Sequence, residues 1–572
     1  MHLGVFLVYL SLLSTQLLKM EERLIELIEN SIKNNWDRKA FTDFQGETLQ
    51  YKDVGRKIAK IHLILEAAGI KPGDKIALCG RNSGNWCVAF LATITYGAVI
   101  VPILHEFKPD NIHNIVNHSE SKLLFVGDMV WENLNEDCMP GLLGVICVKD
   151  FNLVASRSKK LNYARENLNA LFGKKFPMMF LPKHIKYTPE KSPEQLAVIN
   201  YTSGTTGFSK GVMLPYRSLV SNILFCNRTI GIAAGDNIVS MLPMGHVFGL
   251  VYDFLYGICY GAHLHFLTRM PSPKIIMTTV AEIHPRVISC VPLVLEKIFK
   301  KEIIPHIDNK LGKFLLHIPI INEKVKEYAR QMSIKLFGGH IKEVIIGGAP
   351  FNAEVESFVR QIKFPYSIAY GMTECGPIIC HSPWNETEYM SCGKVADRMS
   401  VKVLSDDPEH IPGELVCKGE NTMLGYYKNQ EATNQIFDKD GWLHTGDMAI
   451  INSKGDVYIK GRCKNMLLSA SGQNIYPEEI ESRLNNLPLV NESLIIMSRD
   501  KLVALIYPDM EEAMRNNLNE NKLLEALELS KNELNKELPP YSQITKVFLR
   551  SEEFEKTAKK SIKRYLYQNI DI

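Results

Sequence analysis

The sequence lacks the features that would point to a thiol-bound metal or to a nucleic acid. Its twelve cysteines are scattered singly and form no CxxC pair, which excludes the usual zinc and redox spacings. The formal net charge is +3 over 572 residues, too weak to indicate a DNA-binding face. No internal repeat or low-complexity segment is present. Scattered thiols that stay reduced favour a cytoplasmic globular protein.

Residues 1–19 form the one apolar stretch that could serve as a signal or an anchor. No Lys or Arg precedes the apolar run, and no small-residue cleavage pattern follows it. Four polar residues interrupt the run between positions 11 and 16, so it falls short of the ~20 apolar residues of a membrane span. We therefore interpret residues 1–19 as an extension, with Met20 as a candidate natural start.

The length of the chain predicts more than one domain, because single hydrophobic cores stop growing at roughly 250 to 300 residues. Short apolar runs alternate with helical patterns through the first 380 residues, which predicts an α/β fold with parallel sheets covered by helices. After residue 400 the pattern changes to turn-punctuated β pairs and then to a small α+β unit. In this unit we expect SLIIMSRDKLVALIYPD to form a hairpin and a charged helix to follow over roughly 511–536. We predict a large N-terminal domain with a β-barrel-like part at 20–461. A small mobile α+β domain follows at 462–572.

A loop rich in glycine and hydroxyl groups follows the strand pattern LAVINY. Its sequence is TSGTTGFSKG, residues 202–211. Glycines let backbone N–H groups turn inward as an anion nest, the hydroxyls add donors, and Lys210 adds a positive charge. The loop is not a Walker motif, because no GK[ST] stands at the required spacing. We predict that polyphosphate binds here through Thr202, Ser203, Gly204, Thr205, Thr206, Gly207 and Lys210.

Six further motifs follow this loop along the chain. They are LPMGHVFG at 242–249, IGGAP at 346–350, YGMTE at 370–374, GWLHTGD at 441–447, GRCKNMLLSASGQNIYPEEIE at 461–481 and FEKTAKKSIKRYLY at 554–567. With these motifs the chain resembles the adenylate-forming superfamily, and more closely its long-chain fatty acid acyl-CoA synthetases. The resemblance implies a fatty acid, ATP and CoA as substrates and Mg²⁺ as cofactor. It also implies that an acyl-adenylate forms before the acyl-CoA.

Two carboxylates in these motifs also have a physical interpretation of their own. Glu374 follows a strand pattern and offers the hard oxygen ligand that suits Mg²⁺. Asp447 could accept hydrogen bonds from both hydroxyls of a ribose, although TGD alone leaves a turn or cap aspartate open. The resemblance implies that Glu374 is the catalytic metal ligand, and it adds nucleotide contacts from Gly348, Ala349, Pro350, Tyr370, Gly371, Met372, Thr373 and Arg462.

The remaining candidates concern the acyl group, the hinge and CoA. His246 follows a strand pattern, where a structural role at a helix start stays open, and the resemblance implies that it orders the carboxylate entrance. Phe248 and Tyr252 are candidate liners of the acyl pocket. Lys464 matches the hinge about which the small domain would rotate. Gly472 lies in a glycine loop that would then meet the pantetheine of CoA.

The last motif departs from the pattern that it resembles. When it is aligned on FEKTA and on IKR, Ser561 occupies the position of the catalytic lysine. In an extended segment Lys559 would share a face with Ser561, so we expect it to replace the missing lysine in part. Two alternatives stay open for this basic cluster. It could be the solvated face of a C-terminal helix, or a patch at the inner surface of the membrane.

Three functions stay open at this point. An active fatty acid:CoA ligase fits all the motifs. A ligase that passes its acyl group to a carrier protein or another acceptor would use the same nucleotide motifs. A nucleotide- or acyl-binding protein with weak activity is favoured by Ser561 alone. The sequence does not set the acyl chain length, because an apolar pocket distinguishes chain lengths by only ~0.8 kcal/mol per buried CH₂. It also does not set whether the protein is a monomer or a homodimer.

Overall fold

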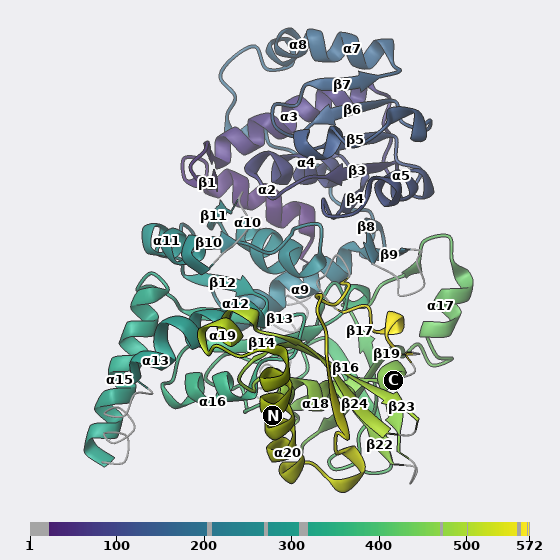
Figure 1. Ribbon diagram of the computed structural model, residues 1–572. Coiled ribbons are helices and arrows are strands. Elements are labelled where there is room, and N and C mark those ends of the chain that lie inside the picture. Colours follow the sequence, from purple (N-terminus) through teal and green to yellow (C-terminus); the bar gives the residue numbers. More distant parts are fainter. Residues whose placement is uncertain are drawn as a thin grey trace, which may run out of the picture.

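The computed structural model describes residues 22–202, 209–267, 273–307, 319–469, 473–499, 501–556, 562–568 and 570. The predicted α/β fold is confirmed, because a large N-terminal domain of helix-covered sheets is followed by a smaller C-terminal domain (Figure 1). Among the described helices, none is long and apolar enough to cross a membrane.

The first large sheet has the strand order β15-β14-β13-β12-β10-β11-β1-β2. Its inner strands are parallel, and the edge strands β2 and β15 are antiparallel to their neighbours. Its central strands β12 and β13 are buried throughout, as expected where helices cover both faces. The strands are β1 (Lys39–Asp43), β2 (Thr48–Gln50), β10 (Asn237–Ser240), β11 (His263–Phe266), β12 (Val287–Cys290), β13 (Glu343–Gly347), β14 (Tyr366–Gly371) and β15 (Ile378–His381).

The second large sheet has the order β18-β9-β8-β4-β3-β5-β6-β7. Strands β3, β4, β5, β6 and β8 are parallel, whereas β7, β9 and β18 pair in antiparallel fashion. The strands are β3 (Lys75–Cys79), β4 (Val99–Ile103), β5 (Leu123–Val126), β6 (Gly144–Cys147), β7 (Leu153–Ser156), β8 (Leu196–Thr202), β9 (Lys210–Pro215) and β18 (Gly425–Tyr426).

Buried helices join the two sheets into one core. Every residue of α4 (Gly84–Thr95) except Asn85 is buried, as in a helix that is apolar on all sides and lies between layers. The ring of Phe254 lies 6.2 Å from Trp86 and 5.4 Å from Phe90 on α4. The main helices of this domain are α2 (Leu24–Asn34), α3 (Tyr51–Ala67), α5 (Pro109–His118), α7 (Lys159–Glu166), α8 (Leu168–Lys175), α9 (Tyr216–Thr229), the π-helix η3 (Gly249–Leu255), α10 (Tyr256–Cys259), α11 (Pro273–Ile283), α12 (Pro292–Ile298), α15 (Pro319–Leu336), α16 (Ala353–Gln361) and α17 (Gln430–Ile436).

The predicted barrel-like part is an open, antiparallel four-stranded sheet. Its order is β16-β17-β19-β20, with β16 (Met399–Leu404), β17 (Gly413–Gly419), β19 (Leu443–Ile451) and β20 (Val457–Arg462). Isolated bridges from Cys380 to Val395 and from Lys394 to Asp456 connect this sheet to the first large sheet. The small sheet therefore adds to the core of the large domain, and its edge strands β16 and β20, both within the described residues, do not pair with each other to form a barrel.

The small domain contains the predicted hairpin and a helical layer. Strands β23 (Val490–Ser498) and β24 (Lys501–Pro508) form the hairpin, and β25 (Lys546–Leu549) pairs parallel to β24. The charged helix expected over roughly 511–536 is two helices, α19 (Met510–Arg515) and α20 (Glu520–Glu537), because Asn517 adopts a φ of +52° and Asn519 caps α20. The domain also includes β21 (Leu467–Leu468), β22 (Asn474–Ile475) and α18 (Pro477–Leu484).

Candidate active site

The two ends of the predicted phosphate loop are held together by strand pairing. Thr202 ends β8 and lies opposite Lys210, which begins β9. The loop residues Ser203, Gly204, Thr205, Thr206 and Gly207 lie outside the described residues. The ammonium of Lys210 lies 4.8 Å from the centroid of the Tyr426 ring.

Tyr426 links the phosphate loop to the predicted metal ligand. Its hydroxyl donates a hydrogen bond of 2.8 Å to Oε1 of Glu374, which lies in the 3₁₀ turn η5 (Thr373–Cys375) after β14. Burial and the Glu374 carboxylate raise the pKa of Tyr426 well above its usual range, so the phenol remains a donor. The pairing of β18 with β9 places Tyr426 beside the loop. Lys210, Tyr426 and Glu374 therefore form one cluster.

The donor set of this cluster fits a metal that keeps most of its water. No group of three or more His, Cys, Asp or Glu side chains that could hold a metal occurs in the described part of the chain. Glu374 alone would supply one hard oxygen ligand, which is the usual arrangement for Mg²⁺ bound between a protein and substrate phosphates.

A second cluster surrounds Asp447. The hydroxyl of Tyr370 donates to Oδ2 of Asp447 at 2.6 Å, and Nε of Arg462 lies 2.9 Å from Oδ1. Asp447 is buried inside strand β19, opposite Arg462 on β20, and this excludes the turn aspartate that TGD alone left open. Burial raises the pKa of Asp447, while Arg462 and Tyr370 act in the opposite direction. The structure brings these three predicted residues together.

The predicted adenine wall lies at the carboxyl ends of β13 and β14. Gly348, Ala349 and Pro350 follow β13 directly and are exposed. Gly348 has a φ of +88°, and a Cβ there would meet nothing within 4 Å. Gly371 ends β14, where a Cβ would lie 1.9 Å from the carbonyl oxygen of Pro377, so only glycine fits. The next residues are Met372, which is partly exposed, and Thr373, which is buried.

Two asparagines that the sequence analysis missed hold the loop before His246. Asn82 accepts from the N–H of Met244 at 3.0 Å and donates to the carbonyl of Leu242 at 2.7 Å. Asn200 of β8 donates to the carbonyl of Gly245 at 2.9 Å. In the sequence, Asn200 could have been recognised as a candidate because it is the one polar residue before the final tyrosine of the apolar run LAVINY. These contacts bring the loop to the same edge as Thr202.

His246 and the predicted acyl liners continue from this loop. Nδ1 of His246 accepts from the N–H of Phe248 at 3.2 Å. The Phe248 ring lies 5.1 Å from that of Tyr252, and a Cβ at Gly347 would lie 2.9 Å from Phe248. Tyr252 is buried, and its hydroxyl forms a 3.0 Å hydrogen bond with Nδ1 of His381. Tyr252 and Phe248 are both buried in the core, and Phe248 packs beside Gly347, the residue before the predicted adenine wall.

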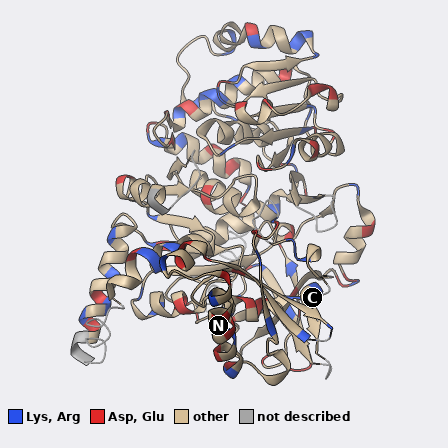
Figure 2. Ribbon diagram, in the orientation of Figure 1, with Lys and Arg blue, Asp and Glu red and all other residues tan. Residues whose placement is uncertain are grey.

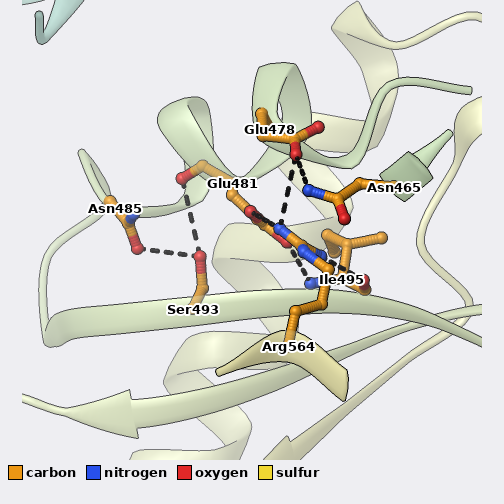
Figure 3. A network of polar contacts seen from close by, with 7 residues as sticks. All are labelled: Asn465, Glu478, Glu481, Asn485, Ser493, Ile495 and Arg564. Atoms are coloured by element: carbon orange, nitrogen blue, oxygen red, sulfur yellow. Dashed lines mark hydrogen bonds and ion pairs between the residues drawn. The ribbon is translucent and has the colours of Figure 1, made fainter. Parts of the chain in front are cut away.

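The predicted hinge lies in the 3₁₀ turn η6 (Cys463–Asn465), where Lys464 is exposed. Figure 3 shows how the turn is tied to the small domain: the Asn465 amide donates to Oε1 of Glu478 at 2.6 Å. The Arg564 guanidinium lies 4.0 Å from Glu478 and 2.6 Å from Glu481. The turn, helix α18 and the last motif therefore share one polar network.

The remaining predicted residues, Gly472 and Lys559, lie outside the described residues, as does Ser561. The chain on either side of residues 557–561 is described. Lys556 and Ile562 form an antiparallel bridge, and the N–H of Lys563 donates to the carbonyl of Glu555 at 2.8 Å. The alternative of a continuous C-terminal helix is therefore wrong for these flanks, because their backbone groups pair across the segment.

The chain is similar in sequence to curated proteins of known name. Among curated proteins, rat long-chain-fatty-acid–CoA ligase ACSBG1 is 27% identical over 516 residues, covering 83% of this chain and 67% of that protein. The long-chain-fatty-acid–CoA ligase of Escherichia coli O157:H7 is 26% identical over 496 residues, 82% of each chain.

Solved structures share the fold. ATP-bound MatB from Rhodopseudomonas palustris has a TM-score of 0.73 at 20% identity, over 94% of this chain and 98% of that one. A fatty acyl CoA synthetase from Mycobacterium tuberculosis has a TM-score of 0.64 at 22% identity, over 95% and 98%. Residues 28–427 match the AMP-binding enzyme family, and residues 464–569 match the AMP-binding enzyme C-terminal domain. The chain is therefore a member of the AMP-binding enzyme family.

Proposed function

We propose that this protein is an ATP-dependent fatty acid:CoA ligase, which forms an acyl-adenylate and pyrophosphate and then acyl-CoA and AMP. The observation that carries the proposal is the convergence of two clusters at the ends of β8 and β14. One contains Lys210, Tyr426 and Glu374, and the other contains Tyr370 and Asp447 with Arg462. The names of the curated relatives supply the class of acid.

In the first half-reaction a fatty acid carboxylate attacks the α-phosphate of ATP. At an effective dielectric constant of about 20, two unit charges about 4 Å apart repel by about 4 kcal/mol, or roughly three decades of rate. Lys210 and the loop donors would offset this repulsion by preorganised positive charge. Mg²⁺ bound at Glu374 would neutralise part of the phosphate charge. Tyr426 keeps the Glu374 carboxylate in place.

The second cluster would bind the nucleoside. Asp447 would accept hydrogen bonds from the ribose hydroxyls, and Tyr370 with the backbone of 348–350 would enclose the adenine. His246 would position the fatty acid carboxylate and Phe248 would line its entrance, since both follow the loop that Asn200 holds at the end of β8.

The second half-reaction would require the small domain to move. We place the domain boundary near Arg462 and the hinge at Lys464, an exposed residue in the short turn between the two domains. Rotation would bring the glycine loop with Gly472 toward the pantetheine of CoA. In the preceding adenylation step Lys559 would act, because serine and not lysine stands at position 561. We further propose a cytoplasmic protein, since all twelve cysteines are free thiols.

The test is pyrophosphate release from ATP, Mg²⁺ and palmitate, followed by thioester formation after CoA is added. We expect both products, and Asp447→Asn should raise the KM for ATP. A panel of acids from acetate to stearate would define the chain length. Pyrophosphate release without a CoA thioester would instead support transfer to a carrier protein, and no release with any acid would support a binding protein.

A further inference from the structure

One surface of the large domain carries positive charge that the proposed reaction does not use. Residues 149–191 contain ten Lys or Arg and three Asp or Glu, a surplus of seven, whereas the whole chain has a net charge of +3. The rest of the protein is therefore slightly acidic. Figure 2 shows blue segments on α7 and α8, the two helices of this region. The charge is local, and it predicts a local partner.

The most exposed large apolar side chains lie within this same region. Met178 is 85% exposed and Met179 is 74% exposed, the two highest values among the large apolar residues that the structure describes. Both follow α8 in the sequence KKFPMMFLPK, 174–183. Water contact at two adjacent methionines is unfavourable unless a partner covers them.

The two methionines belong to a segment that contains a packed aromatic cluster. The rings of Phe172, Phe176 and Phe180 lie 4.9 to 5.5 Å from one another, and His184 lies 5.5 Å from Phe176. Phe180 is buried, and its ring lies 6.0 Å from Trp36 of the main core. The segment that carries Met178 and Met179 is therefore anchored to the core through Phe180.

Exposed lysines flank Met178 and Met179 in the sequence. Lys174, Lys175, Lys183 and Lys186 are all exposed, and the ammonium of Lys175 lies 3.7 Å from Glu66. We call residues 172–186 the α8 surface. Figure 1 places α7 and α8 at one end of the molecule, far from β14 and β19, so a partner bound here would leave the candidate active site open.

We propose that the α8 surface docks on an anionic phospholipid bilayer. The lysines would meet the lipid phosphates, and the two methionines would enter the boundary between headgroups and acyl chains. This occupant uses both the charge and the exposed apolar atoms. A nucleic acid would use the charge but leave Met178 and Met179 in contact with a polyanion. The proposal goes beyond the proposed ligase activity, because vesicle binding requires no catalysis.

Flotation of the full chain with lipid vesicles tests the proposal. We expect binding to phosphatidylcholine/phosphatidylglycerol vesicles and little binding to phosphatidylcholine alone. Replacing Lys174, Lys175, Lys183 and Lys186 by Ala should weaken binding by about fivefold per lysine. Met178→Ser with Met179→Ser should weaken it by roughly tenfold at constant net charge. Both variants should retain pyrophosphate release on a water-soluble acid, which also shows that they are folded.

Matched controls lie elsewhere on the chain. Met510 and Met514 on α19 are exposed methionines, and Lys301, Lys439, Lys501 and Lys522 are exposed lysines. The same replacements at these positions should leave vesicle binding unchanged. Equal loss of vesicle binding in the control and test variants would overturn the proposal, and so would equal binding to neutral and anionic vesicles. It would also be overturned if an oligonucleotide displaced the protein from vesicles and the methionine variant bound that oligonucleotide as well as the wild type does.

Discussion

Tyr426 and Glu374 come from different sheets and meet through one hydrogen bond of 2.8 Å. Tyr426 belongs to the short strand β18, which pairs with β9 beside the phosphate loop, and Glu374 follows β14 of the other sheet. The bond therefore ties the predicted metal ligand to the sheet that carries Lys210.

Tyr426→Phe should raise the Mg²⁺ concentration needed for pyrophosphate release. A hydrogen bond to a charged group contributes about 1.5 to 3 kcal/mol, so we expect a loss of about ten- to a hundredfold at limiting Mg²⁺. Glu374→Gln should cost more, because it removes the ligand itself. Tyr427→Phe is the matched control, since its hydroxyl contacts Glu120 instead. Similar losses at Tyr426 and Tyr427 would show that the contact with Glu374 is not what matters.

Asp253→Asn should change the pH dependence of stability. Asp253 is buried in η3, and burial raises its pKa to about 7. A carboxyl with a raised pKa stays protonated in the folded state while the unfolded state ionises, so wild-type stability falls as pH rises from about 4 to about 7. Asparagine does not ionise, so the variant lacks this pH-dependent loss of stability. The Tm of the variant relative to wild type should be higher at pH 8 than at pH 5, and a difference independent of pH would contradict the assignment.

Lys464→Pro should separate the two half-reactions. Proline fixes φ near the value of a helical turn, which η6 already has, but prevents the change in dihedral angle that a hinge requires. Pyrophosphate release and thioester formation should therefore change by different factors, whereas Lys464→Ala should alter neither by much. Equal losses in both steps with Lys464→Pro would place the hinge elsewhere.

Arg564→Ala should destabilise the small domain. Its guanidinium is mostly buried, pairs with Glu481 at 2.6 Å and donates to the carbonyl of Ile495 at 3.0 Å (Figure 3). Removing one partner of a buried ion pair costs roughly 3 kcal/mol, because the other charge stays buried. A lower Tm is expected, with Arg564→Lys intermediate. Lys563→Ala is the control and should change Tm little, since Lys563 pairs with Glu555 at the surface.

Ser561→Lys should accelerate the first half-reaction. A preorganised donor typically contributes about 10² to 10³ in rate, and Lys559 is expected to supply part of that contribution in the wild type. Pyrophosphate release should therefore increase in Ser561→Lys and decrease in Lys559→Ala, with Lys560→Ala as the neighbouring control. A gain of less than about threefold together with no loss from Lys559→Ala would exclude both roles.

Sequence reasoning found the candidate site because its chemistry is concentrated in short contiguous segments. Tyr370 and Glu374 stand on one motif, and Asp447 and Arg462 come from neighbouring strands of one hairpin. It missed Asn82 and Tyr426, because a single asparagine or tyrosine outside a recognised motif has many ordinary structural uses. It also left a C-terminal helix open, since the spacing of Lys556 and Lys563 fits a helix face as well as a bridge.

The sequence by itself determined the α/β class, through alternating apolar periods, and it predicted the nucleotide chemistry, through local runs of glycine, hydroxyl and carboxylate groups. The tertiary structure alone decided which distant groups meet: Tyr370 with Asp447, Tyr426 with Glu374, and Asn200 with the loop before His246. The physical reason is that strand order sets these contacts, and a local pattern does not encode strand order. The same holds for Met178 and Met179, because only the folded structure shows that these two apolar residues face water while the neighbouring Phe180 is buried.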